Sequence, residues 1–414
     1  MRPPPIDSST TPPRAEPEGS PDCDQIEIDL DDAQIALAHR TDAELLESAR
    51  LFRLLSSPWL SRVARAVGEF AVRYRLPFAE RLAHATIYRQ FVGGRTLLEV
   101  ERASARLSGR DVLSILDYGA EGKDDEAAYN QTMTECIRAI EFAGRQHSIP
   151  MVSTKLSGLA SNDLLEAVSG GGLLTAEHES GYRALARRVD SLCHVAREAG
   201  VQLAIDAEES WMQPAIDKVV MTVTLRYNRG RAVILNTYQL YRHDRIALLK
   251  ANHAQCRTRS VVLGAKLVRG AYMAKERRRA RAEGRPSPIQ PDKAATDRDF
   301  DQAVAYCLDN LRDICFVNAS HNQRSVQLMV EGIARRGIPR NHGHMMFCQL
   351  YGMGDNLTFN LAEAGYRVAK YLPYGPVREV VPYLVRRAEE NASVLGESSR
   401  ELAMIERELT RRGL

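Results

Sequence analysis

The sequence predicts an α/β protein, a (β/α)8 TIM-type barrel preceded by an N-terminal helical arm. Three observations lead to this prediction. After residue 108, short apolar and β-branched runs alternate with helical stretches, eight such runs occur, and polar residues gather near their C-terminal ends. Eight strand–helix units fit a closed barrel better than an open doubly wound sheet. The 414 residues, 44% of them hydrophobic, also suffice for one large core.

The candidate strands are short runs, each followed by sequence with helical character. They are residues 114–122, 150–158, 201–209, 232–241, 263–272, 314–322, 345–350 and 368–375. The stretch 173–200 illustrates the helical signal, because it has acidic residues near its start and Gly200 at its end.

Polar residues stand near the C-terminal ends of six of these runs. They are Asp117, Lys155, Asp206, Gln239, His321 and Tyr371. In a (β/α)8 barrel this edge of the strands is the active-site face. The sequence therefore predicts an active site built from these strand ends.

The predicted organisation has four parts. We expect a disordered segment over 1–40, the helical arm over 41–110, the barrel over 111–395 and a C-terminal helix or tail over 396–414. The first 24 residues are rich in proline, serine and acid and cannot bury a core. They hold five acidic residues and two arginines, so a standard mitochondrial import signal is absent or atypical.

Composition narrows the class of protein. A net charge of +3 gives no electrostatic case for a nucleic-acid partner, and no apolar run reaches the length of a membrane span. The seven scattered cysteines form no CxxC pair, which indicates free thiols and no metal site. Arginines such as Arg50 and Arg53 decorate the helical arm. A solvated face is one interpretation of them, and a peripheral membrane contact is the alternative.

An arginine pair marks the helix expected after the last strand. Arg386 and Arg387 lie about 100° apart on a helix, and Glu390 is placed to pair with either guanidinium. Two positioned guanidiniums suit a carboxylate ligand. Ordinary surface charge is the alternative reading of the same spacing.

Several motifs of the chain resemble those of a known family. The segment YLPYGPVREVVPYLVRRAEEN (371–391) resembles the C-terminal signature of the proline dehydrogenase family, and KLVRGAYMAKE (266–276) is similar to its basic strand end. Further motifs match in the family's order: FVGGRTLLE (91–99), LDYGAEG (116–122), IDAEES (205–210), NTYQLY (236–241), NASHN (318–322) and QLYGMGDNLTF (349–359). The resemblance covers roughly residues 85 to 392 and is closer to eukaryotic, monofunctional members.

The resemblance implies an activity and roles for individual residues. It implies FAD-dependent oxidation of L-proline to Δ1-pyrroline-5-carboxylate, the first step of proline catabolism, with a quinone as electron acceptor. It implies catalytic roles for Asp206 and Lys266. The implied substrate-binding residues are Lys155, Tyr272, Tyr371, Arg386, Arg387 and Glu390. The implied FAD-binding residues are Asp206, Gln239, Lys266, Arg269, Gly270, Ala271, Lys293, Ser320 and His321. On family grounds the protein is mitochondrial and faces the inner membrane, and a cytosolic pool is the alternative.

Some features depart from the family pattern or leave alternatives open. Bacterial relatives usually carry arginine where Lys266 stands, and QPDKAATD (290–297) departs from the family's loop at the adenosine. The chain has no GxGxxG fingerprint, so FAD binding must use barrel-end loops. Hydroxyproline, pipecolate or a methylproline is the alternative substrate, although Tyr371 favours proline. A Schiff-base aldolase using Lys155 or Lys266 and a non-catalytic binding barrel are the rivals from other classes.

Overall fold

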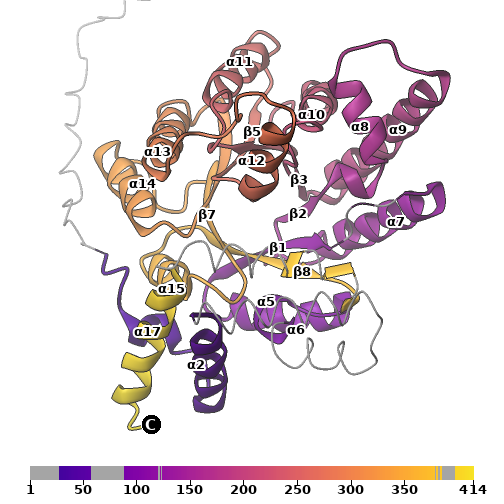
Figure 1. Cartoon of the computed structure of the whole chain (residues 1–414). Helices are drawn as coiled ribbons and strands as arrows, with labels where there is room; N and C mark the ends of the chain where they lie inside the picture. Colours follow the sequence, from indigo (N-terminus) through magenta and orange to yellow (C-terminus); the bar gives the residue numbers. More distant parts are fainter. Residues whose placement is uncertain are drawn as a thin grey trace, which may run out of the picture.

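The computed structural model describes residues 28–56, 88–119, 122, 124–377, 379–380, 383–384 and 397–414. Within these residues, eight parallel strands form a closed barrel in chain order, and the last strand pairs with the first (Figure 1). The strands are β1 (Val112–Tyr118), β2 (Met151–Thr154), β3 (Gln202–Ile205), β4 (Ile234–Gln239), β5 (Leu263–Val268), β6 (Ile314–Ala319), β7 (Met345–Leu350) and β8 (Val368–Tyr374). Each coincides with or overlaps a predicted run, so the barrel prediction is confirmed.

Helices follow the strands and surround the barrel (Figure 1). The described ones are α7 (Glu126–Ala143), α8 (Asn162–Ser169), α9 (Ala176–Ala199), α10 (Gln213–Tyr227), α11 (Arg245–Arg257), α12 (Met273–Ala282), α13 (Lys293–Asp309), α14 (Gln323–Arg335) and α15 (Asp355–Glu363), with the 3-10 turn η2 (Leu156–Gly158) after β2. The arm contributes α2 (Asp42–Ser56), α5 (Arg89–Phe91) and α6 (Leu97–Ser108). In the described part of the chain, no helix has both the length and the apolar character needed to span a membrane.

Helix α9 shows how local sequence fixes an element. The Thr175 hydroxyl accepts a hydrogen bond from the backbone N–H of His178 and caps the first turn. Gly200 ends the helix with φ +74°, a left-handed conformation that glycine adopts without steric cost. The helix therefore begins and ends close to the predicted bounds.

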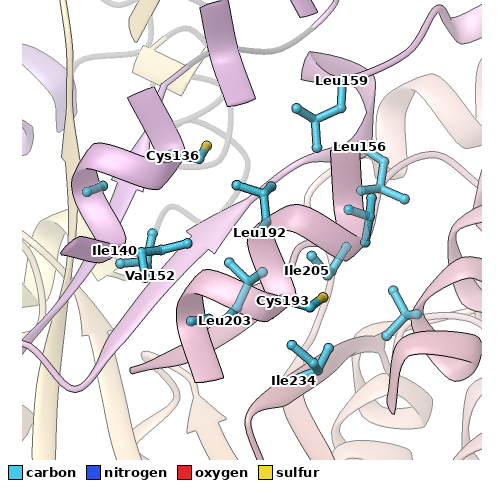
Figure 2. Close-up of a cluster of buried hydrophobic side chains, with 14 of the residues drawn as sticks. Cys136, Ile140, Val152, Leu156, Leu159, Leu192, Cys193, Leu203, Ile205 and Ile234 are labelled. Atoms are coloured by element: carbon cyan, nitrogen blue, oxygen red, sulfur yellow. The ribbon is translucent and has the colours of Figure 1, made fainter. Parts of the chain in front are cut away.

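The largest apolar core lies between strands and helices. In Figure 2, Ile140 of α7 and Leu192 of α9 lie close to side chains of the neighbouring strands, among them Val152 and Leu203. All four of these side chains are fully buried. Burying one such side chain contributes about 1.5–3 kcal/mol, so this layer supplies much of the energy that holds the helices to the barrel.

A second apolar layer fills the barrel interior. It contains Ile115, Met151, Ala204, Leu235, Val317, Met346, Cys348, Ala369 and Tyr371. Because successive side chains of a strand face opposite sides, residues two positions further along these strands also point inward. This layer is therefore the floor beneath the C-terminal ends of the strands.

Both ends of the described chain pack together beside the barrel. Helix α1 (Ala33–Leu37) and α2 pack against the C-terminal helix α17 (Glu397–Arg411) through Leu37, Phe52 and Ile405. The expectation of disorder up to residue 40 is therefore wrong for residues 28–40. Its physical reason is that Leu30, Ala36 and Leu37 find buried positions against other segments, which composition alone did not indicate.

Candidate active site

Polar side chains occupy the layer directly above the apolar floor of the barrel. Asp117 stands two residues after Ile115 on β1, and Asp206 stands two residues after Ala204 at the end of β3. Lys155, at the end of β2, follows the same alternation after Met151. The inward-facing side chains are therefore apolar in the middle of these strands and charged at their C-terminal ends. We call Asp117, Lys155, Asp206 and Lys266, with Ser153 and Tyr371, the polar ring.

Asp206 is the centre of this ring. One of its carboxylate oxygens, Oδ1, accepts hydrogen bonds from Lys266 Nζ at 2.5 Å and Ser153 Oγ at 2.7 Å. The other, Oδ2, accepts one from the Tyr371 hydroxyl at 2.7 Å and lies 3.5 Å from Lys155 Nζ. Side chains from β2, β3, β5 and β8 therefore meet on one carboxylate.

Lys155 also connects Asp206 to a second acid. Its Nζ lies 3.3 Å from Asp117 Oδ2, and both side chains are buried. A buried ammonium between two carboxylates lowers the electrostatic cost of placing both acids in the barrel interior.

The two acids have opposite pKa shifts. Burial raises the pKa of Asp206, but Lys266 and Lys155 outweigh it and hold the pKa below its usual range, so this carboxylate stays ionised. Burial raises the pKa of Asp117 against the effect of Lys155, and the charge of Asp206 adds to the rise. Such divergence between neighbouring acids is common in active sites.

Two tyrosines predicted to contact substrate take different places. Tyr371, on β8, packs on the apolar layer and reaches the polar residues above it with its hydroxyl. Lys266 Nζ lies 4.5 Å from the centre of the Tyr371 aromatic ring. Tyr272 immediately precedes α12 and is also buried. Lys275 Nζ lies 5.9 Å from the Tyr272 ring centre. Tyr371 therefore binds Asp206 directly, whereas the ring of Tyr272 lies near Lys275.

The residues predicted to bind the cofactor lie mainly on the arc formed by β4, β5 and β6, which are neighbours in the barrel. Gln239, at the end of β4, donates its amide to the Glu208 carbonyl at 2.7 Å. Arg269, after β5, donates to Ser320 Oγ at 2.6 Å and to Asp297 Oδ1 at 2.8 Å. The guanidinium is thus already bonded within the protein.

Lys293 joins this group through an acid, because its Nζ also contacts Asp297 at 2.5 Å. Gly270 has φ +132°, and a Cβ there would lie 2.5 Å from the ring of Tyr241. Only glycine therefore lets the chain turn past that ring, and Ala271 continues from it. His321 accepts a hydrogen bond at Nε2 from the Leu350 N–H at 3.1 Å.

The predicted arginine pair and its acid lie outside the described residues. Arg386, Arg387 and Glu390 therefore stay a prediction from the sequence.

Sequence reasoning missed several members of the site. Ser153 was not singled out, although its position two residues before Lys155 is a signal that strand alternation could have supplied. Asp117 was noted at a strand end without a role. Glu208 and Glu209 were given no role either, and both lie before α10, which begins at Gln213. The buried Glu208 carboxylate instead accepts the Ser157 N–H at 3.0 Å, and Glu209 contacts Lys275 at 2.5 Å.

Comparison with known proteins gives relatives over most of the chain. Carbapenem antibiotics biosynthesis protein CarD of Pectobacterium carotovorum subsp. carotovorum is 32% identical over 351 residues, covering 85% of this chain and 91% of the relative. Hydroxyproline dehydrogenase of Xenopus laevis is 32% identical over 409 residues, covering 89% and 87%. Proline dehydrogenase 1, mitochondrial, of Caenorhabditis elegans is 39% identical over 244 residues, covering 58% of this chain and only 40% of the relative.

Among solved structures, proline utilization A from Bdellovibrio bacteriovorus, inactivated by N-propargylglycine, matches with a TM-score of 0.68 and 20% identity. The match covers 86% of this chain and 38% of that one, and at this identity it supports the fold alone. The family model for proline dehydrogenase matches residues 100–400, which include all eight strands. With that match, and with relatives above 30% identity over most of both chains, this chain belongs to the proline dehydrogenase family.

Proposed function

We propose that this protein oxidises L-proline to Δ1-pyrroline-5-carboxylate with FAD as its cofactor. The observation that carries the proposal is the convergence of Lys155, Lys266 and Tyr371 on Asp206 inside the barrel mouth of a proline dehydrogenase family member. An ionised, fully bonded carboxylate at this point fixes two cations and one aromatic ring. Catalysis by such a site rests largely on positioning.

The donor set suits FAD. Lys266 and Arg269 offer positive charge, while Gln239, Ser320 and His321 offer amide, hydroxyl and imidazole groups, all from the contiguous arc β4–β6. We propose that these residues hold the cofactor together with Asp206, Gly270, Ala271 and Lys293. When bound, FAD supplies the two-electron acceptor that amino acid side chains lack.

Most of the substrate residues are proposed for the opposite arc, β8–β1–β2, and Tyr272, which follows β5, is proposed to contact the substrate from the other side. Lys155 would contact the proline carboxylate, with Arg386 and Arg387 as partners and Glu390 holding the arginines. Tyr371 would pack on the pyrrolidine ring, with its hydroxyl fixed by Asp206. Oxidation removes a hydride from the ring carbon beside nitrogen and a proton from nitrogen, and leaves a carbon–nitrogen double bond.

A simple spectrum tests this proposal. The purified protein should be yellow, denaturation should release a flavin with the mass of FAD, and L-proline should bleach the colour under anaerobic conditions. Colourless, well-folded protein, or flavin that proline does not reduce, would overturn the proposal.

Related imino acids form the second candidate. Its support is the match to a hydroxyproline dehydrogenase over 87% of that relative. Rates of bleaching by proline, hydroxyproline, pipecolate and a methylproline would rank the substrates, and Tyr371 leads us to expect proline first. A Schiff-base aldolase is disfavoured, because Lys155 and Lys266 both contact carboxylates while such a lysine must be uncharged.

The arginine pair has its own test. Charge-assisted hydrogen bonds contribute about 1.5–3 kcal/mol each, so Arg386→Met or Arg387→Met should lower kcat/KM for proline roughly ten- to hundredfold. Pyrrolidine, which lacks the carboxylate, should lose far less. Equal losses on both substrates would show that the arginines do not bind the carboxylate.

For the electron acceptor and location we propose a membrane quinone and the mitochondrion. The C. elegans relative is named as mitochondrial, and Arg50 is exposed on α2, where it could approach a membrane surface. Fractionation of tagged protein tests the location, and recovery solely in the cytosol would overturn it. Reduction of a soluble quinone by proline tests the acceptor.

A further inference from the structure

Two segments at the barrel mouth are held by the ends of the described chain. At the first residue of α14, directly after the β6–α14 loop, Gln323 donates to Asp31 Oδ2 at 2.9 Å and accepts from Arg400 at 3.0 Å. In the loop between β7 and α15, the Gly354 N–H donates to Glu401 Oε1 at 2.5 Å. Consecutive residues of helix α17, Arg400 and Glu401, therefore bind the start of α14 and the loop before α15.

The two loops contact each other at a residue proposed for the cofactor. Gly354 has φ +63°, and a Cβ at this position would lie 2.9 Å from His321 Nδ1. The Leu350 N–H, from the same β7 segment, binds the other ring nitrogen of His321. The Leu350 N–H thus fixes one ring nitrogen, the Gly354 backbone lies close to the other, and Glu401 binds the N–H of Gly354.

Glu401 is an unusual residue for this purpose, because its side chain is buried beside another acid. Only 9% of the residue is exposed, and a small cavity separates it from His321, lined also by Met353, Gly354 and Arg400. Burial raises the pKa of Glu401 to about 7, and the charge of Asp355 adds to the rise against Lys370 and Arg40. A buried carboxylate is costly unless it is bonded, so its contact with Gly354 is a specific one.

We propose that Glu401 is a positioning residue, through which helix α17 fixes the β7–α15 loop and the imidazole of His321 and so sets the affinity of the barrel for FAD. The inference rests on the proposed function, because it assumes that His321 contacts the cofactor. Glu401 itself touches neither substrate nor cofactor in this arrangement. Its effect is transmitted through one backbone N–H.

The test is a titration of flavin-free protein with FAD, followed by fluorescence. Glu401→Ala removes the acceptor of the Gly354 N–H, and we expect the Kd for FAD to rise roughly tenfold or more. Glu401→Gln keeps an acceptor oxygen and should recover most of that loss. The KM for proline of FAD-saturated Glu401→Ala should stay within about twofold of wild type, because substrate groups are not moved.

The matched control lies on the same helix. Glu406 is exposed and pairs with Arg53 of α2, and not with a barrel loop. Glu406→Ala should therefore leave the Kd for FAD unchanged. An equal Kd for wild type and Glu401→Ala would overturn the inference. If Glu401→Ala does not fold, Glu401→Asp carries the test, since its shorter side chain draws the carboxylate away from the Gly354 N–H. An unchanged Kd in that variant would likewise overturn it.

Failure of this inference and failure of the proposed function give different results. Wild-type protein that binds no FAD would contradict the proposed function. Wild type that binds FAD and is reduced by proline, with a Kd insensitive to replacement of Glu401, would contradict only the role of α17.

Discussion

Two buried lysine–aspartate pairs lie on opposite sides of the barrel wall. Lys266, on β5, points into the barrel and binds Asp206. Lys370, on β8, is adjacent to the inward-facing Tyr371 and so points outward, where it binds Asp355 at 2.8 Å. The inner pair lies among the proposed substrate and cofactor residues. The outer pair connects the strand to α15 and, through Arg40, to the N-terminal arm.

The comparison teaches that the same ionic contact can serve function or assembly, depending on which face of a strand carries it. A lysine in a strand is conspicuous in sequence, but its chemistry does not reveal its task. The alternation of the strand does, because it separates the interior of the barrel from the helix-covered outside. Variants of the two aspartates should therefore differ in what they damage.

The largest expected effect is on stability, at the outer pair. Asp355→Asn leaves Lys370 and Arg40 buried without their carboxylate, because both bind the same acid. Removing one partner of a buried ion pair costs about 3–5 kcal/mol. Urea unfolding at pH 7 should show a loss of this size. A loss below about 1 kcal/mol would show that the outer pair does not hold the arm to the barrel.

The next effect is on catalysis, at the inner pair. Asp206→Asn removes the charge that fixes Lys266 and Lys155, together with an acceptor for Tyr371. Losing two charge-assisted contacts should lower kcat/KM for proline by about a hundredfold or more. On protein saturated with flavin, the loss should exceed that of Asp355→Asn by at least tenfold. Similar losses in the two variants would remove the distinction between the pairs.

A smaller effect concerns Glu208, a buried acid whose pKa is raised, in contrast to the lowered pKa of Asp206. Burial raises the pKa of Glu208 from 4.5 to about 7. An acid with a raised pKa in the folded state stabilises the protein fully below the unfolded pKa, and this contribution is lost as pH rises through 7. Relative to Glu208→Gln, wild type should therefore lose about 1 kcal/mol of unfolding free energy between pH 6 and pH 8.

Urea denaturation of both proteins at several pH values measures this difference. Asp206 provides the contrast, because its pKa is lowered and it stays ionised over the same range. A pH dependence identical in wild type and Glu208→Gln would show that Glu208 does not titrate in this window.

The smallest effect concerns an exposed pair that links the two ends of the described chain. Arg53 and Glu406 link α2 to α17 at 2.9 Å, with side chains 56% and 46% exposed. Solvent and salt screen such a pair, so Glu406→Gln should change the free energy of unfolding by less than about 0.5 kcal/mol. A loss approaching that of Asp355→Asn would mean that exposure does not separate the two contacts.

The sequence predicted the barrel well because its strands have a strong local signal. All eight runs appeared as strands, and Asp206, Lys155 and Tyr371 were identified at strand ends that the structure brings together. Alternation and chain order suffice for such predictions. Both signals depend only on residues that are close in sequence, and each of the eight strands of a barrel shows them again.

Contacts between distant segments were harder to predict. Gln323 meets Asp31 and Arg400, and Glu401 meets Gly354, across separations that no local pattern encodes. The burial of Glu208 was not predicted for a related reason, since it depends on the Ser157 N–H, which lies far away in the sequence. The arginine pair was predicted from spacing and family resemblance, and it lies outside the described residues.

Closure of the barrel by β1 and β8 also bears on how the chain folds. These strands pair along their full length, Val112 with Val368 through Tyr118 with Tyr374, although they lie far apart in sequence. Contacts of such high sequence separation slow folding, because loop entropy must be lost before they form. A chain cut or stalled before Val368 would expose unpaired edges on β1 and β7. Such edges recruit other chains, so we expect fragments of this protein to aggregate rather than persist as open barrels.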